Sequence, residues 1–348
     1  MRAATLLVAV IAAAAVAGFA VSTTQRPPPP APPPRPTPTP VPTPVPLGPI
    51  SGIGITVADD PAAAQVVLFG GVQNDNNTWI WSAGTWSHAE PLTNPPGRID
   101  ASAAYNPLTK EVMMFGGRHN PLTGGPSLND TWAWNGVTWR ELDPGTSGPT
   151  PGEGSSMAWD DALSEMVLVT AGSAPAGDQT WVWSRSHWIL KIHGAVAPSA
   201  FDLPMAFDPV TRSLIAEGCC YAPRSQLGAL DATWRWDGQR WEQLAGTAQP
   251  LPGSALALNP AIDRLTLCNC GPMLALPVLA VWSGQTWGLL DVARLPVEPV
   301  AEITDATSGQ LLILGSPTPS SQFVAQPVHL WALSGSTWRQ LDATTPGG

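Results

Sequence analysis

A tryptophan pattern that recurs six times restricts the fold of this chain more than any other sequence feature. The pattern, Trp-x-Trp-x4-Trp, is complete in four copies, and the last two copies each replace one tryptophan, with Ala280 and Leu333. Turn sequences such as Asn135-Gly136 and Asp237-Gly238 separate its second and third positions, which is typical of a β-hairpin. The tryptophans of the pattern are Trp79, Trp81, Trp86, Trp132, Trp134, Trp139, Trp181, Trp183, Trp188, Trp234, Trp236, Trp241, Trp282, Trp287, Trp331 and Trp338.

A second pattern recurs in register with the first. An Asp or Asn, followed by Pro in four of the six copies, precedes an apolar run that begins six residues later. Such a pair opens a turn, because the Asx side chain hydrogen-bonds the nearby backbone and proline fixes φ. The apolar run after it predicts a strand. The six turn residues, spaced by 46, 54, 48, 51 and 46 residues, are Asp60, Asn106, Asp160, Asp208, Asn259 and Asp305.

Together the two patterns predict four short strands in each of six units. A period near 50 residues indicates an all-β, six-bladed β-propeller with four antiparallel strands per blade; seven blades are the alternative. Tryptophans two apart on a strand face the same side, so we expect them to pack between blades. The predicted propeller spans residues 50–348, with repeats at about 50–99, 100–154, 155–203, 204–254, 255–300 and 301–348.

The strands of the first and last repeats determine how the ring can close. The first repeat contains an inner strand of its own near residues 53–57, and the last contains an outer strand near residues 338–341. We therefore expect the ring to close by packing of blade on blade. A blade shared by both ends of the chain is the alternative, and it would require part of residues 47–52 to pair with the last repeat.

The N-terminal 49 residues do not fit the repeat. Residues 1–25 predict a signal peptide or a signal-anchor helix, because Ala3–Val21 is an uncharged apolar run long enough to span a bilayer. Residues 26–49 form a proline-rich linker that predicts an extended polyproline conformation. We expect an extracytoplasmic propeller on a single-pass membrane anchor, or a secreted one if the signal is cleaved.

The charge of the propeller restricts its partners. Three of the 16 basic residues precede residue 50, and all 26 acidic residues follow it, so the remainder carries a net charge of −13. A surface that acidic repels phosphate backbones, so no nucleic acid partner is expected. We expect a monomer that meets a protein or a glycan at the cell exterior.

The repeats resemble kelch repeats and the kelch-like central domain of galactose oxidase. The matching motifs are Phe69-Gly70-Gly71, Phe115-Gly116-Gly117, Asn129-Asp130-Thr131-Trp132 and Pro96-Gly97-Arg98. The resemblance covers residues 50–348 and weakens along the chain. It implies the propeller architecture, and architecture alone does not imply an activity.

Catalytic signatures of propeller enzymes are not matched. An oxidase like galactose oxidase needs two tyrosines and two histidines around copper, whereas this chain has only Tyr105, which we expect in the core, and Tyr221. The aspartate of a sialidase Asp-box is replaced by Trp134 and Trp282. We therefore predict no catalytic residue, no metal and no cofactor. A non-catalytic binding or protein-interaction module is the favoured function; a glycan-active hydrolase or lyase with a loop-face pocket is the alternative.

The hydrolase or lyase alternative would be favoured if acidic and basic side chains from several blades converged on the axial mouth.

Long loops at residues 118–131, 221–233 and 315–330 alternate around the ring and are expected on one face. The binding residues predicted there are Arg118, His119, Tyr221 and Arg224.

Four cysteines follow second strands of adjacent repeats. Cysteines in an exported domain favour disulfides. A bond between blades 4 and 5, a vicinal Cys219–Cys220 bond and a four-thiolate metal site all remain open at this stage. The disulfide candidates are Cys219, Cys220, Cys268 and Cys270.

Overall fold

The computed structural model describes twelve segments of one compact unit, Val45–Gly348. Among these residues no helix is both long and apolar enough to cross a membrane. The predicted N-terminal helix and proline-rich linker lie outside them. The described segments are 54–71, 76–119, 124–150, 154–171, 178–193, 198, 203–218, 232–244, 255–268, 279–295, 297–316 and 327–342.

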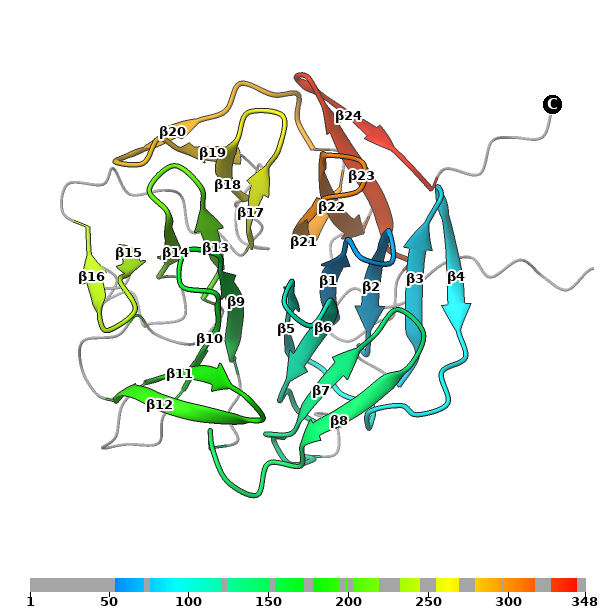
Figure 1. Cartoon of the computed structure of the whole chain (residues 1–348). Helices are drawn as coiled ribbons and strands as arrows, with labels where there is room; N and C mark the ends of the chain where they lie inside the picture. Colours follow the sequence, from blue (N-terminus) through cyan, green and yellow to red (C-terminus); the bar gives the residue numbers. More distant parts are fainter. Residues whose placement is uncertain are drawn as a thin grey trace, which may run out of the picture. The chain divides into compact units, whose positions relative to one another are not determined.

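Six four-stranded antiparallel sheets form the blades of a β-propeller (Figure 1). Each sheet follows chain order, as the repeat predicts, and the seven-blade alternative is wrong. The strands of blades 1 to 3 are β1 (Thr56–Asp60), β2 (Gln65–Phe69), β3 (Thr78–Ser82), β4 (Thr85–Ala89), β5 (Ser102–Asn106), β6 (Glu111–Phe115), β7 (Thr131–Trp134), β8 (Trp139–Asp143), β9 (Ser156–Asp160), β10 (Glu165–Thr170), β11 (Gln179–Ser184) and β12 (His187–His193). Those of blades 4 to 6 are β13 (Met205–Asp208), β14 (Ser213–Glu217), β15 (Thr233–Trp236), β16 (Trp241–Gln243), β17 (Ala255–Asn259), β18 (Arg264–Cys268), β19 (Leu279–Trp282), β20 (Trp287–Leu289), β21 (Glu298–Asp305), β22 (Gln310–Ser316), β23 (His329–Ser334) and β24 (Thr337–Gln340).

The turn between the first and second strands of each blade is set by its Asx side chain. In blade 2, Oδ1 of Asn106 accepts hydrogen bonds from the backbone N–H groups of Leu108 at 3.0 Å and Thr109 at 3.3 Å. Lys110 ends this turn at a φ of 59°, and β6 follows at once. Local side-chain-to-backbone bonds therefore reverse the chain where the second sequence pattern predicts it.

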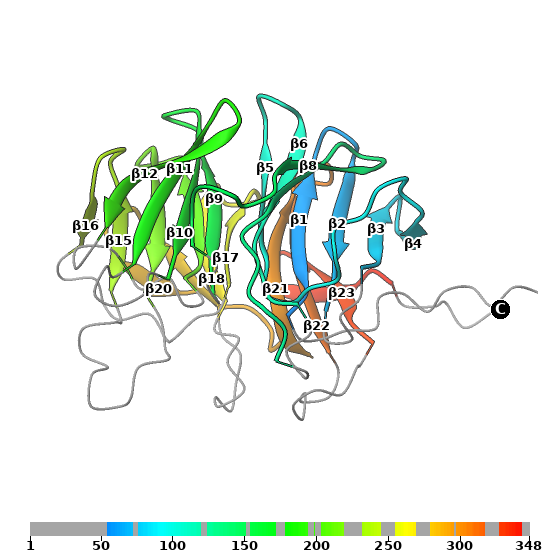
Figure 2. The same cartoon turned by 90° about the horizontal axis from the view of Figure 1, so that it is seen from below.

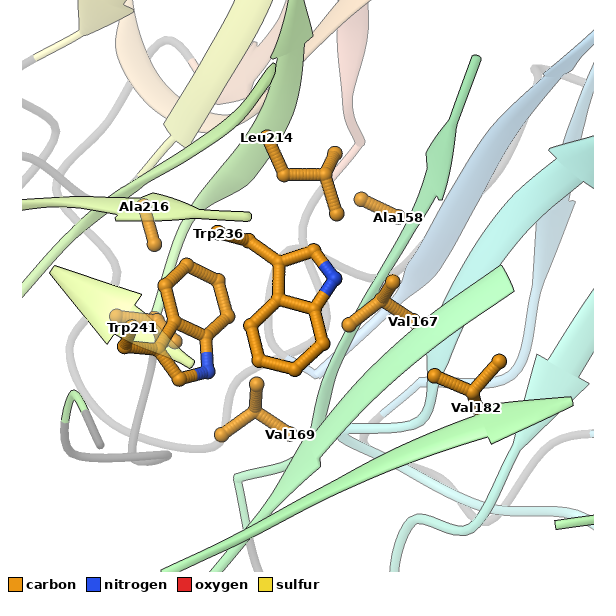
Figure 3. Close-up of a cluster of buried hydrophobic side chains, with 9 residues drawn as sticks. Ala158, Val167, Val169, Val182, Leu214, Ala216, Trp236 and Trp241 are labelled. Atoms are coloured by element: carbon orange, nitrogen blue, oxygen red, sulfur yellow. The ribbon is translucent and has the colours of Figure 1, made fainter. Parts of the chain in front are cut away.

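Tryptophans of the first pattern pack between neighbouring blades, as predicted. Trp236 and Trp241 of blade 4 face Val167 and Val182 of blade 3 in a shared core (Figure 3). The third tryptophan of four blades also donates its indole N–H to a buried threonine hydroxyl at the start of the third strand in the preceding blade. These bonds, each 2.9 Å long, are Trp139 to Thr78, Trp188 to Thr131, Trp241 to Thr180 and Trp287 to Thr233.

Blade 6 closes the ring by packing directly on blade 1. Leu68 and Trp81 share a buried cluster with Leu312 and Leu330. The backbone N–H of Ala306 also donates to Oδ2 of Asp59 at 3.0 Å. Because β1 to β4 and β21 to β24 are each continuous in sequence, neither sheet is shared between the two ends of the described chain.

The Pro-Gly-Arg and Asn-Asp-Thr-Trp motifs join two blades through a buried ion pair. The Arg98 side chain is fully buried, and its guanidinium donates to both carboxylate oxygens of Asp130 at 2.6 and 2.8 Å. It also donates to the carbonyls of Pro96 and Gly116. Asp130 accepts a further bond from the indole N–H of Trp132 at 2.6 Å. The role of these motifs is therefore structural.

Candidate functional site

Two of the predicted loop residues are held by backbone carbonyls. Arg118 forms isolated β-bridges with Ile99 and Ser127, and its Nε donates to the Gly125 carbonyl at 3.3 Å. The Nδ1–H of His119 donates to the Gly97 carbonyl at 2.8 Å. Both side chains thus take part in the structure of their loop, and their role in binding stays a prediction. Tyr221 and Arg224 lie outside the described residues.

One of the four cysteines lies in the described chain. Cys268 ends β18, is 1% exposed and is disulfide-bonded. Its partner lies outside the described residues, as do Cys219, Cys220 and Cys270, so the pairing stays a prediction. The described residues hold no group of three or more His, Cys, Asp or Glu that could bind a metal.

An axial cavity of about 570 Å³ is surrounded by the inner strands β1, β5, β9, β13, β17 and β21 of all six blades (Figure 1). Side chains alternate along a strand, so residues two apart share one side of it, and two rings of such residues line the cavity together with intervening residues such as Ala58 and Ile303. One ring, called the mouth ring, holds the residues immediately before each Asx turn: Asp59, Tyr105, Trp159, Phe207, Leu258 and Thr304. The other, called the floor ring, holds the residues two positions earlier: Val57, Ala103, Met157, Met205, Leu256 and Glu302.

The cavity opens on the face of the Asx turns. Pro61, Pro107 and Asp161, which belong to those turns, line it next to the mouth ring. In an antiparallel meander the turns between strands 1 and 2 and between strands 3 and 4 share one face, which is seen where β5 joins β6 and β11 joins β12 (Figure 2). The long loops predicted to bind ligand connect strands at the opposite end of the blades.

Tyr105 and Trp159 bring aromatic groups to this cavity. Tyr105 is half-buried and lines the cavity, so the expectation that it belongs to the core was wrong in part. Trp159 is the one tryptophan outside the repeated pattern. Sequence reasoning missed the mouth ring, although its signal is simple: these residues directly precede the six Asx turns.

The carboxyl groups of the cavity differ in their partners. Glu302 accepts bonds from the Thr266 hydroxyl at 2.8 Å and the Cys268 backbone N–H at 3.1 Å. Burial raises the pKa of Glu302 well above its ordinary value, although the bonds from Thr266 and Cys268 lower it. Burial also raises the pKa of Asp59 from 3.8 to about 7, with Asp305 and Asp60 adding repulsion. Oδ1 of Asp59 is buried and has no hydrogen-bond partner in the described chain.

Basic side chains do not join these carboxyl groups. The cavity receives Asp59, Asp161 and Glu302 from blades 1, 3 and 6, and no Lys, Arg or His is among its described lining residues. Both oxygens of Glu302 accept hydrogen bonds from residues of blade 5.

A second cavity, of about 320 Å³, lies between blades 1 and 6, and we call it the closing groove. Blade 1 contributes the end of β3 and its hairpin, and blade 6 contributes its Asx turn and β24. Its lining side chains are mainly hydrogen-bonding groups. They include Gln65, Ser82, Asp305, Thr307, Ser308, Gln310 and Arg339.

The hairpin of blade 1 is shorter than those of blades 2, 4 and 5. β3 and β4 remain paired to Ser82 and Thr85, which leaves a two-residue turn, whereas the paired strands β7 and β8 stop at Trp134 and Trp139 and leave a four-residue loop. The longer loops of blades 2, 4 and 5 reach the Asx turn of the preceding blade. The shorter turn of blade 1 does not reach the Asx turn of blade 6.

The space beside the hairpin glycines also differs between blade 1 and blades 2 and 4. A Cβ built on Gly136 would lie 3.1 Å from Cβ of Ala63, and one on Gly238 would lie 2.7 Å from a methyl of Leu163. A Cβ on Gly84 would meet no atom within 4 Å, which holds for Gly335 of blade 6 as well. The short hairpin of blade 1 thus borders the closing groove without filling it; blades 3 and 6 have hairpins of the same length.

Most polar groups of the closing groove already have partners, and three are available to a ligand. Asp305 accepts bonds from the N–H groups of Thr307 and Ser308 within its own turn. Arg339 and the Thr307 side chain are exposed, and Gln310 is half-buried. The groove thus offers one guanidinium, one amide and one hydroxyl above an apolar base that includes Trp81.

Comparisons with known proteins show the fold alone. No family model and no curated protein sequence matches the chain. Among solved structures, YjhT is 12% identical, with 84% of this chain and 99% of that chain covered and a TM-score of 0.56. The Aleuria aurantia lectin AAL, in complex with Fucalpha1-6GlcNAc, is 12% identical, with 83% and 94% covered and a TM-score of 0.56.

A second lectin has the same fold. SapL1, in complex with alpha methyl fucoside, is 13% identical, with 87% of this chain and 99% of that chain covered and a TM-score of 0.52. The chain is therefore a six-bladed β-propeller similar in fold to YjhT and to these lectins. The resemblance to kelch repeats stays a prediction at these levels of identity.

Proposed function

We propose that this protein is a non-catalytic glycan-binding propeller and that the closing groove holds the glycan. The observation that carries the proposal is the groove itself, a space of about 320 Å³ with an exposed guanidinium, a half-buried amide and an apolar base. Binding pockets typically combine apolar walls with a few polar groups that orient the ligand. The closing groove has both.

The chemistry of the groove suits sugar hydroxyls. The guanidinium of Arg339 presents several N–H donors in a planar fork, and two adjacent hydroxyl oxygens can accept from it together. The Gln310 amide both donates and accepts, so it can pair with a third hydroxyl. The apolar side chains of Trp81 and Leu341 would lie under the C–H groups of the sugar ring.

Solved lectins of the same fold support this choice of ligand. Two of them are complexes with fucose-containing ligands, Fucalpha1-6GlcNAc and alpha methyl fucoside. We therefore propose fucosylated glycans as the first class to test. We also propose that the repeat is of the kelch type, that an N-terminal segment exports the propeller or anchors it to a membrane, and that Arg118, His119, Tyr221 and Arg224 contribute to any further contact on the loop face.

The test is a glycan array with the purified chain, followed by mass spectrometry of each bound glycan after incubation. The proposal expects binding to a restricted set of glycans, fucosylated ones among them. Each bound glycan should have the same mass after incubation as before it. Cleaved products would favour the hydrolase or lyase alternative. Absence of binding across the array, from a chain shown to be folded, would refute the proposal and favour a protein partner.

A further inference from the structure

The mouth ring of the axial cavity has a polar side and an apolar side. Asp59 comes from blade 1, and its neighbours in the ring are Thr304 of blade 6 and Tyr105 of blade 2. Across the axis stand Trp159 and Phe207. The floor ring beneath is apolar apart from Glu302, whose two oxygens are bound by blade 5. A ligand in this cavity would therefore meet polar groups on one side and hydrocarbon on the other.

Asp59 is the one carboxyl group of the two rings that keeps an oxygen without a partner in the described chain. Its Oδ2 accepts the N–H of Ala306, and its Oδ1 is unpartnered. Thr304 donates its hydroxyl to the Leu258 carbonyl at 2.6 Å, so this neighbour has no proton left for Asp59. Because Oδ1 is buried, Asp59 acts on the cavity through its negative charge, and no basic side chain among the described lining residues balances that charge.

The aromatic and acidic side chains that line the cavity favour binding of a cation. The faces of Tyr and Trp rings attract positive charge, and a carboxylate adds direct attraction. Every ionisable side chain among the described lining residues is acidic or phenolic, so a cation meets no like charge there. A volume of about 570 Å³ lies in the range of small-molecule sites.

We propose that the axial cavity binds a small alkylammonium ligand, with its cationic head against Asp59 and its hydrocarbon part against Trp159 and Phe207. This site shares no residue with the closing groove. It is independent of the proposed glycan site, and a protein with both would recognise two different ligands on the same face of the ring.

The protonation state of Asp59 makes this binding depend on pH. The pKa of Asp59 is raised to about 7 by burial, and Asp60 and Asp305 add like charge. Burial, Asp60 and Asp59 also raise the pKa of Tyr105 above its ordinary value of 10.0, so the phenol stays neutral at pH 8. A cation favours the ionised carboxylate. With a pKa near 7, the ionised fraction rises from about one tenth at pH 6 to about nine tenths at pH 8, so affinity should rise about tenfold.

The experiment is a calorimetric titration of the full chain with hexyltrimethylammonium, and with hexan-1-ol as the uncharged comparison. The ammonium should bind at least tenfold more tightly than the alcohol at pH 8, and about tenfold more weakly at pH 6 than at pH 8. Asp59→Asn should abolish both the preference and the pH dependence. Trp159→Leu should weaken the ammonium and the alcohol to a similar extent, because both place their hydrocarbon chain against this ring.

Two control variants separate this site from its surroundings. Asp263→Asn removes an exposed carboxylate outside both cavities, and Arg339→Ala alters only the closing groove, so both should bind the ammonium within about twofold of wild type. Equal affinity for ammonium and alcohol, or no pH dependence in the wild type, would overturn the proposal. A wild-type chain that binds no glycan but binds the ammonium as expected would count against the proposed function alone.

Discussion

Replacing Asp59 with Asn should stabilise the folded chain more at pH 8 than at pH 5. Asp59 lies at the end of β1, where its Oδ2 accepts the Ala306 N–H across the junction that closes the ring. The amide oxygen of Asn can keep this bond. The substitution therefore removes the buried charge and leaves the contact between blades 1 and 6 in place.

The magnitude follows from the pKa of Asp59, which burial raises from 3.8 to about 7. Because the folded state holds this proton more tightly than the unfolded state, stability is fully present below pH 3.8 and is lost as pH rises toward 7. Each pH unit in that window costs about 1.4 kcal/mol. Between pH 5 and pH 8 the wild type should therefore lose about 3 kcal/mol that Asp59→Asn does not lose.

Urea unfolding followed by tryptophan fluorescence at pH 5 and pH 8 measures this difference. Asp161→Asn is the matched control, since Asp161 is an exposed carboxylate at the same cavity mouth, and its effect on unfolding free energy should be small at both pH values. If Asp59→Asn changes the unfolding free energy equally at pH 5 and pH 8, the argument that burial holds the proton on this carboxyl is wrong.

Two further predictions concern contacts between blades. Thr180→Val should lower the unfolding free energy by about 1 to 3 kcal/mol, because it leaves the buried indole N–H of Trp241 without an acceptor. Thr180→Ser keeps the hydroxyl and should therefore retain most of this stability. Equal losses in both variants would show that packing, and not the hydrogen bond, is responsible. Arg98→Lys should lower the unfolding free energy by about 3 to 5 kcal/mol, since lysine cannot reproduce the bidentate pair with Asp130 in a fully buried site. A change below 1 kcal/mol in urea unfolding would show that the ion pair contributes little.

The architecture was predictable because two local patterns repeat in register. Each Asx turn forms from bonds within a few residues, and each tryptophan pair faces one side of its strand, so neither feature depends on distant parts of the chain. Six copies of both patterns were enough to predict six blades and tryptophans between them. The sequence left ring closure open between packing of blade on blade and a blade shared by both ends, and the structure shows blade 6 packed on blade 1.

The cavities were harder to predict because they depend on several blades at once. Tyr105 sits on a strand whose alternation shows that its side chain points away from that of Asn106, but not whether it faces a neighbouring blade or the axis. Likewise Gly84 and Gly136 occupy similar hairpins in the sequence. Only the pairing of the flanking strands shows that the first hairpin is shorter than the second.

Arg98 shows a different limit. Its motif was noticed as part of the repeat, but its partner Asp130 lies 32 residues away in another blade. A buried arginine is rare unless it is paired, and sequence alone does not reveal burial. The chemistry and the loop position of Arg118 and His119 predict a role in binding. The structure shows that both side chains donate hydrogen bonds to backbone carbonyls of the same region.

Titration of one fucosylated glycan into wild-type and Arg339→Ala protein tests the central claim most directly. The glycan to use is the fucosylated one that binds most tightly on the array. Arg294→Ala, which removes an exposed arginine outside both cavities, is the matched control. Loss of hydrogen bonds from a charged donor costs about 1.5 to 3 kcal/mol, so Arg339→Ala should weaken binding at least about tenfold. Arg294→Ala should bind like the wild type. Unchanged affinity in Arg339→Ala would contradict the assignment of the closing groove as the glycan site.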